Sequence, residues 1–312
     1  MARRPRAKGK TKARIDVHQV VTDRMIEILE RGTRPWVHPW KMAGQGISFP
    51  KRHNGETYRG MNVLLLWATA EEKGYRSPFW MTFRQALEYG ANVRKGEKGA
   101  MVIKYGAVVK DEAGNAIKPG SEPSDEDRKI GYLRSYTVFN AEQIEGLSEG
   151  FYPQPVQSED APTAAPILDL EAYFGGVGAR IETASCNPCY VPKLDMIRMP
   201  PIAEFTSTNE YYSTLSHELI HWTKPSSRVG RKQSETKAEY AFEELVAEIG
   251  SVFVFCNLDL TPDLEQSTAY IGSWLKALRE DKKFIFKAAS LAQTAADYID
   301  ERATGATQKV AA

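Results

Sequence analysis

The chain has 312 residues, and its content of 42% hydrophobic and 26% charged residues is typical of a globular protein with one large or two medium domains. Its apolar stretches are too short to span a membrane, and its basic N-terminus lacks the apolar segment of a secretory signal, so we expect no membrane partner. Three cysteines are too few for a disulfide framework, which favours a reducing, cytoplasmic setting.

Charge divides the chain into two unlike halves. Residues 1–150 hold 26 Lys and Arg against 18 Asp and Glu, or +8, whereas residues 151–312 hold 15 against 22, or −7, and the two sum to the net +1. This asymmetry indicates two domains with different tasks. We predict an α+β fold with a disordered basic arm at 1–14, a mixed α/β domain at 15–150, a proline-containing linker at 151–166 and a second domain at 167–312.

Hydrophobic spacing predicts the elements of the first half. Apolar residues recur at helical intervals over 15–29, and further helices are expected at 62–73 and at 82–89, the last with Thr82 as its N-cap. Strands are expected at 100–105, 107–110 and 132–139, and the acidic segment 111–129 between them is predicted to be a mobile loop.

Basic and aromatic side chains are interleaved throughout this half. Single-stranded nucleic acid is bound by cationic grooves whose exposed rings stack on bases, whereas the recognition helix or zinc finger of a duplex reader is absent from the sequence pattern. The alternative is that the tryptophans belong to the core and the cations to a solvated rim. The hypothesis of a single-stranded-DNA-binding domain assigns DNA contacts to Trp36, Trp40, Tyr58, Arg59, Trp80, Phe83, Arg84, Arg94, Lys95 and Lys98.

The second half contains the pentapeptide His-Glu-Leu-Ile-His at 217–221. If 214–222 is helical, His217 and His221 lie one turn apart on one face and are spaced to hold a single metal ion. Glu218 lies beside them, placed to act as the catalytic base on a metal-bound water. A surface helix with two chance histidines is the alternative, and it is disfavoured because the same helix carries an apolar face.

A second helix, predicted over 239–255, sets acidic residues within an apolar run, where an unpaired carboxylate is costly. Glu243, Glu244 and Glu248 are therefore candidates for a third ligand. The pattern resembles thermolysin-like zincins, in which a ligand Glu follows the second His by about twenty residues. That resemblance implies Glu244 as the ligand, with Glu243 as its rival, and Glu248 as a partner that hydrogen-bonds a ligand histidine. Two further helices are expected, at 262–279 and at 281–302.

The implied reaction is metal-assisted hydrolysis of a peptide bond, with Zn²⁺ as the expected metal and Mn²⁺ as the alternative. An oxyanion needs a hydrogen-bond donor, and Tyr211, Tyr212 and Tyr240 are candidates among which spacing does not choose. Segment 189–200 partly alternates between apolar and polar residues, which predicts a strand ending at a proline. This strand either pairs with an extended peptide substrate or is an ordinary half-buried strand.

Several motifs of the first half occur in the order known from one family. They are Trp36-x-x-x-Trp40, Tyr-Arg-Gly-Met-Asn at 58–62, Trp-Met-Thr-Phe-Arg-Gln-Ala at 80–86, Val-Arg-Lys-Gly-Glu-Lys-Gly at 93–99 and Phe-Asn-x-x-Gln-Ile-Glu-Gly at 139–146. This series resembles the N-terminal single-stranded-DNA-binding domain of ArdC-type antirestriction proteins, which is also similar to a domain of conjugative TraC-type primases. In that family a zincin-like metallopeptidase domain follows, as the second half of this chain suggests.

The resemblance implies a function that composition and spacing alone do not reach. It implies an antirestriction protein, encoded by a bacterial mobile element, that protects incoming plasmid DNA during conjugation. The implied partners are single-stranded DNA and an unidentified protein substrate, such as a restriction subunit. Two competing hypotheses are a non-enzymatic DNA-coating protein with a structural metal and a nuclease that uses the same metal. The nuclease is disfavoured because the acidic second half is ill-suited to approach phosphate.

Overall fold

The computed structural model of the protein describes residues 16–36, 49–110, 128–152, 167–258, 260 and 270–305. The predicted arm at 1–14, all but the first two residues of the predicted linker, and Trp40 lie outside these ranges. Within the described ranges, no helix is both long enough and apolar enough to cross a bilayer.

The helices of the first half form where the periodicity predicts them. They are α1 (Val17–Glu30), α2 (Met61–Lys73) and α3 (Phe83–Glu88). Helix α1 begins at Asp16, whose side chain accepts the Gln19 N–H and so satisfies one free donor of the first turn. The predicted N-cap of α3 is confirmed: Thr82 forms a reciprocal capping box with Gln85.

The sheet of the first half is built around one long hairpin. Its strand order is β1 (Lys51–Arg52), β2 (Phe79–Met81), β5 (Arg128–Asn140) and β4 (Ala100–Lys110), and a small pair, β3 (Asn92–Val93) with β6 (Ile144–Glu145), lies apart from it. The prediction of two strands at 100–105 and 107–110 is wrong. Strand β4 runs unbroken through Gly106, because pairing with Tyr132 of β5 continues across that glycine. Strand β5 likewise begins at Arg128, four residues before the predicted start.

Among the described residues, the second half holds five α-helices and a small sheet. The helices are α4 (Leu168–Gly176), α5 (Thr208–Trp222), α6 (Lys237–Asn257), α7 (Ile271–Glu280) and α8 (Phe284–Thr304). The sheet has the order β7 (Arg180–Thr183), β9 (Met196–Met199) and β8 (Cys189–Val191), which places β8 at an edge. The single strand predicted at 189–200 is thus two antiparallel strands, joined by a turn in which Asp195 adopts a positive φ of 47°. Short 3₁₀ helices lie at Ala141–Gln143, Glu149–Phe151 and Ile202–Glu204.

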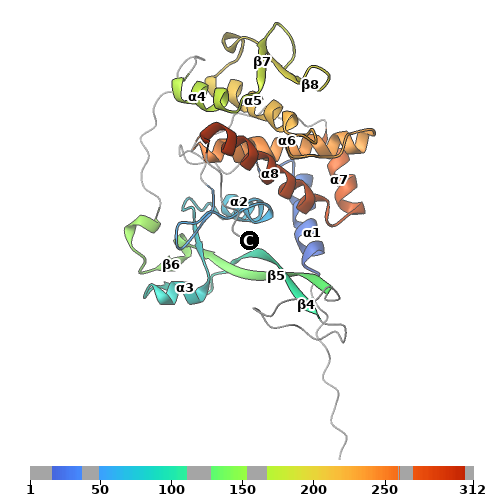
Figure 1. Cartoon of the computed structure of the whole chain (residues 1–312). Helices are drawn as coiled ribbons and strands as arrows, with labels where there is room; N and C mark the ends of the chain where they lie inside the picture. The colour runs from blue at the N-terminus through green and yellow to red at the C-terminus, as the bar shows by residue number, and fades with distance from the viewer. Residues whose placement is uncertain are drawn as a thin grey trace, which may run out of the picture.

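The two halves share one hydrophobic core. Helix α6 packs between α5 and α8, α8 in turn contacts α2, and α1 contacts α7, so the helices of both halves meet in the middle of the molecule (Figure 1). A single cluster of buried side chains contains Val21 and Leu64 from the first half together with Phe253 and Trp274 from the second. The first half is therefore packed directly against the helices that carry the candidate site.

A glycine sets how closely α5 and α6 approach. Gly250 of α6 faces Ile220 of α5, and a Cβ added at residue 250 would lie 2.7 Å from Ile220 Cδ1 and 2.9 Å from its Cγ1. Any other residue there would force the Ile220 side chain, or the helices themselves, to move. This close contact lies next to the two helix faces on which the candidate ligands stand.

Candidate metal centre

Helix α5 carries both histidines of the pentapeptide. The helix begins at Ser207, whose side chain accepts the Glu210 N–H, and it extends six residues further toward the N-terminus than predicted. Its apolar side chains Leu215, Leu219 and Trp222 are buried in the common core. Because residues four apart lie on the same face of a helix, His217 and His221 project together, away from the face that is buried in the core.

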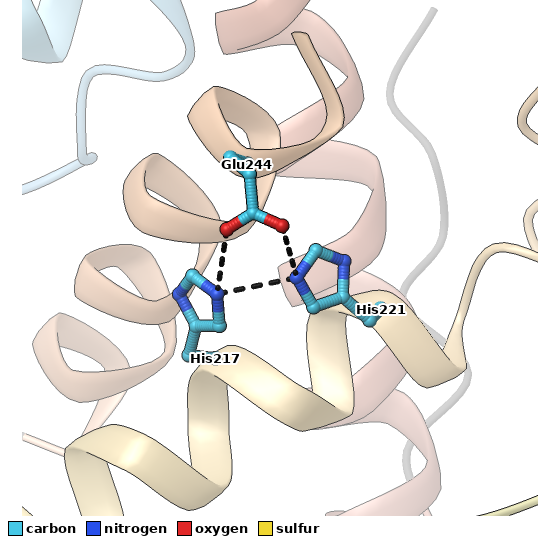
Figure 2. A group of neighbouring side chains, drawn as sticks. All are labelled: His217, His221 and Glu244. Atoms are coloured by element: carbon cyan, nitrogen blue, oxygen red, sulfur yellow. Dashed lines mark hydrogen bonds and ion pairs between the residues drawn. The ribbon is translucent and has the colours of Figure 1, made fainter. Parts of the chain in front are cut away.

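Helix α6 brings a glutamate to the same point from the other side. Its first turn is fixed by a capping box between Thr236 and Glu239. Figure 2 shows that Glu244 points at both imidazoles, with Oε2 3.5 Å from His217 Nε2 and Oε1 3.5 Å from His221 Nε2. The two Nε2 atoms are 3.2 Å apart. Two imidazole nitrogens and one carboxylate group, from two helices, thus converge on one point.

The spacing of these atoms fits a tetrahedral metal. Ligand atoms around a tetrahedral Zn²⁺ with bonds of about 2.0–2.2 Å lie about 3.3–3.6 Å from one another. The two Nε2 atoms are 3.2 Å apart, and each lies 3.5 Å from its nearer oxygen of Glu244, Oε2 for His217 and Oε1 for His221, which is close to that value. Two neutral imidazoles and one carboxylate leave a fourth position open, which is the donor set of catalytic rather than structural zinc sites.

The second nitrogen of His221 has a carboxylate partner of its own. Its Nδ1 lies 3.2 Å from Glu243 Oε1, so Glu243, the rival for the ligand position, supports a ligand instead. Arg231 in turn donates from Nη2 to Glu243 Oε1 at 2.7 Å and from Nε to Oε2 at 3.1 Å. It also donates to Thr223 Oγ1 and to the Ile220 carbonyl, which ties the end of α5 to α6.

Glu248 does not take the predicted place beside a ligand histidine, and that prediction is wrong. Its Oε2 instead accepts hydrogen bonds from Arg34 Nη1 and from Trp36 Nε1, both at 2.9 Å. All three side chains are buried. The reason is tertiary: α6 also packs against the first half of the chain, and Arg34 and Trp36 bring donors from there to the Glu248 carboxylate.

Glu218 lies beside the three converging atoms at the wall of a pocket. The pocket has a volume of about 360 Å³, and its lining includes His217, Glu218, His221 and Tyr240. Glu218 Oε2 accepts the backbone N–H of Tyr190 at 2.7 Å, so the edge strand β8 lies directly over the site. Its other carboxylate oxygen has no hydrogen-bond partner among the described residues.

The structure separates the three candidate tyrosines. The buried hydroxyl of Tyr212 donates to Glu171, and the ring of Tyr211 packs edge-on against Phe205. Tyr240 lines the pocket, where its side chain hydrogen-bonds Glu244. Burial together with the nearby Glu244 carboxylate raises the pKa of Tyr240, so its hydroxyl keeps its proton and remains a donor.

Burial and hydrogen bonding compete at this centre. Burial by itself raises the pKa of Glu243, but the hydrogen bonds from His221 and Arg231 outweigh it and bring the pKa down to about 2. Burial likewise opposes ionisation of Glu244, yet the bond with His217 holds its pKa below the ordinary value. For Glu248 burial prevails, and the pKa is raised.

His217 responds in the opposite sense. Burial lowers the pKa of its imidazole, but the bond to Glu244 and the charge of Glu218 raise it on balance. Because a histidine that binds a metal must be neutral, protonation of His217 competes with metal binding.

Several residues predicted to contact DNA are instead part of the core. Trp36, Trp80 and Tyr58 are buried, so their rings cannot stack on bases, and the prediction is wrong for them. The alternative reading of the tryptophans as core residues holds for Trp36 and Trp80. Both indoles stabilise the core: the Trp36 N–H donates a hydrogen bond to Glu248, and the Trp80 ring packs edge-on against the Tyr75 ring.

The predicted cationic contacts divide into two groups. Arg59, Arg84 and Arg94 each form an ion pair, with Asp297, Glu88 and Glu97 respectively. Lys95 and Lys98 are exposed and have no ion pair with another described residue, and Phe83 is an exposed ring. These last three are the predicted contacts that remain free to meet a ligand.

Two site residues had no signal in the sequence. Arg231 and Arg34 hold Glu243 and Glu248 from 12 and 214 positions away, and neither lies in a motif. Only the expectation that every buried carboxylate has a cationic partner could have prompted a search for them.

Comparison with known proteins covers both halves of the chain. Residues 15–139 match the family described as the N-terminal domain of anti-restriction factor ArdC, and residues 169–291 match a family of zincin-like metallopeptidases. An uncharacterized protein y4eC of Sinorhizobium fredii is 34% identical over 91% of this chain and 91% of its own length. A DNA primase TraC of Escherichia coli is 35% identical over 90% of this chain, which spans only 20% of that primase.

Solved structures agree with these matches. The metal-free crystal structure of the antirestriction protein ArdC from plasmid R388 is 46% identical, with a TM-score of 0.82 over 94% of this chain and 100% of that one. The Mn(II)-bound structure of the same protein is 45% identical over the same shares of both chains, with a TM-score of 0.78.

Proposed function

Because this chain belongs to the ArdC family of antirestriction proteins, we propose that it binds single-stranded DNA and carries a metal-dependent peptidase centre. Its task is to protect incoming plasmid DNA from restriction during conjugation, in the cytoplasm of the recipient bacterium. The peptidase acts on a protein partner, for which a restriction subunit is the leading candidate.

The observation that carries the peptidase proposal is the convergence of His217, His221 and Glu244 beside Glu218. Their separations of 3.2–3.5 Å suit Zn²⁺ or Mn²⁺ as the bound ion. Such an ion, when bound, polarises a carbonyl and lowers the pKa of a bound water. The Mn(II) found in the R388 relative supports manganese as a second candidate besides zinc.

The remaining residues supply a base and its orientation. Glu218 takes a proton from the attacking water and passes it to the leaving amine. The Tyr190 N–H holds one oxygen of this carboxylate, which leaves the other aimed at the water. Glu243 and Arg231 hold the His221 ring in one orientation, since its Nδ1 is fixed by Glu243.

The edge strand β8 and the pocket wall together form the proposed binding site for the peptide substrate. Strand β8 is an edge strand of its sheet over the site, and an extended peptide can add to it by main-chain hydrogen bonds. Tyr240 lines the same pocket and is placed to donate to the oxyanion that forms at the attacked carbonyl.

The test separates chemistry from metal binding. We expect Glu218→Gln to lower hydrolysis of fluorescently labelled casein by about 10²- to 10⁴-fold, because it removes only the general base. Metal content, measured by elemental analysis, should stay at the wild-type level, whereas His217→Ala should lose metal and activity together. Glu235→Gln, at an exposed carboxylate outside the pocket, is the matched control and should change neither.

The competing hypothesis of a DNA coat with a structural metal makes the opposite prediction. Transfer of a plasmid into a restricting recipient should lose protection with Glu218→Gln if proteolysis is the function. Full protection by Glu218→Gln would favour the coat, whereas undiminished casein cleavage by this variant would remove Glu218 from the mechanism.

A further inference from the structure

The β4–β5 hairpin carries cations that no carboxylate in its own strands balances. Neither β4 nor β5 contains Asp or Glu. Lys104 and Arg134 are direct cross-strand partners, both are exposed, and neither forms an ion pair with another described residue. Like charges directly opposite one another destabilise a sheet. A repulsive pair that the fold does not neutralise indicates an anion bound from outside.

Aromatic rings flank this pair on the same face. Side chains alternate along a strand, so Tyr132, Arg134 and Tyr136 of β5 share one face with Lys104. Tyr136 is 44% exposed. The Arg134 guanidinium lies 4.7 Å from the centroid of the Tyr132 ring, a cation–π contact that holds the charge in place without a carboxylate.

A glycine makes room for this arrangement. The Tyr132 ring crosses the backbone of Gly106 so closely that a Cβ at that residue would lie 2.3 Å from the ring. Any other residue would push the ring, and Arg134 on it, out of position. Tyr132, Arg134 and Tyr136 therefore place a ring, a cation and a second ring in succession on one face of β5.

The hairpin offers its face rather than its edge. Strand β4 is the edge strand of its sheet, and an open edge would be free to pair with another strand. Asn62 of α2 blocks that pairing, because its side chain accepts the Ile103 N–H at 2.7 Å and donates to the Ile103 carbonyl at 2.9 Å. The unbroken register from Ala100 with Val138 to Lys110 with Arg128 keeps the face rigid.

We propose that the hairpin face, defined as Lys104, Tyr132, Arg134 and Tyr136, is a binding surface for single-stranded DNA. The two cations contact phosphates, and the Tyr136 ring stacks on an unpaired base. The assignment depends on the DNA binding proposed for this family member and locates it at residues outside the family motifs. A polyanion with accessible bases is the partner whose chemistry fits this alternation of charge and ring.

Salt titration of DNA binding separates the two kinds of contact. With a fluorescein-labelled oligothymidylate, the slope of log K against log[salt] is about −0.7 per phosphate neutralised. The double variant Lys104→Gln/Arg134→Gln should make the slope shallower by about 1.4, for two lost contacts. Tyr136→Ala should weaken binding about 5- to 140-fold at every salt concentration and leave the slope unchanged.

Arg31→Gln is the matched control, because Arg31 is exposed, is paired with Glu27 and is not among the predicted DNA contacts. An equal change of slope in this control would overturn the proposal. So would wild-type binding and slope in the hairpin variants, a result that leaves DNA binding itself intact. No salt-dependent binding by the wild type would instead refute the proposed DNA binding and the hairpin face together. Thermal midpoints equal to wild type show that the variants are folded.

Discussion

The metal centre and the hairpin face treat charge in opposite ways. Around the metal centre, Glu243, Glu244 and Glu248 are buried, and each has a named partner: Arg231, the histidine pair and Arg34. On the hairpin face, Lys104 and Arg134 are exposed and oppose one another without a carboxylate. A buried charge needs a partner within the fold because its desolvation is costly. An exposed charge is solvated by water and therefore remains available to bind a ligand. The difference distinguishes positions that hold the protein together from positions that meet a partner.

The largest expected effect comes from breaking a buried pair. Arg231→Leu leaves the Glu243 carboxylate buried without its cation, which we expect to lower the free energy of unfolding by about 3–5 kcal/mol. Urea denaturation followed by circular dichroism measures this change. The control is Lys232→Leu at the exposed ion pair with Glu239, which should leave the urea midpoint unchanged. Similar effects of the two variants would mean that burial does not separate the two kinds of charge.

Metal addition is expected to have the next largest effect. Zn²⁺ or Mn²⁺ at about 100 times its Kd should stabilise the fold by about 2.7 kcal/mol, since it binds only the folded state. For a chain of this size, with about 2.1 cal/mol/K of unfolding entropy per residue, the thermal midpoint should rise by about 4 °C. Differential scanning calorimetry should show no rise with His217→Ala, and little with Mg²⁺, which prefers oxygen ligands. A rise that survives His217→Ala would place the metal elsewhere.

Substitution of Trp36 should have the smallest effect on stability, and its expected effect on DNA binding contrasts with that of the hairpin face. Trp36→Phe removes one hydrogen bond to Glu248 and should cost about 1–3 kcal/mol of unfolding free energy. DNA affinity and its salt slope should not change, because the indole is buried. The comparison variant is Tyr136→Ala, for which the expected pattern is the reverse. Weaker DNA binding by a fully folded Trp36→Phe protein would restore the role in base stacking first predicted for Trp36.

Local sequence was sufficient where the chemistry depends on one helix. Histidines four residues apart on a helix face the same way in any fold, so His217 and His221 could be paired from their spacing. Caps are local as well, and Thr82 was identified because a capping box needs only residues three positions apart. The break predicted at Gly106 failed for the converse reason, since the partner that keeps the strand continuous, Tyr132, is distant in sequence.

Contacts between side chains on different helices or segments could not be predicted from the sequence, because tertiary packing determines them. Glu243 and Glu244 point about 100° apart around α6, and only the packing of α6 on α5 brings Glu244 to both imidazoles and Glu243 to the outer nitrogen of His221. The Trp36 ring could stack on a base, but the side chain is part of the core, because its indole N–H donates to the buried carboxylate of Glu248 on α6. Sequence determines which groups a helix or strand presents. Contact between distant segments determines which of them are desolvated, and desolvation decides whether a charge or ring stabilises the fold or remains available to a ligand.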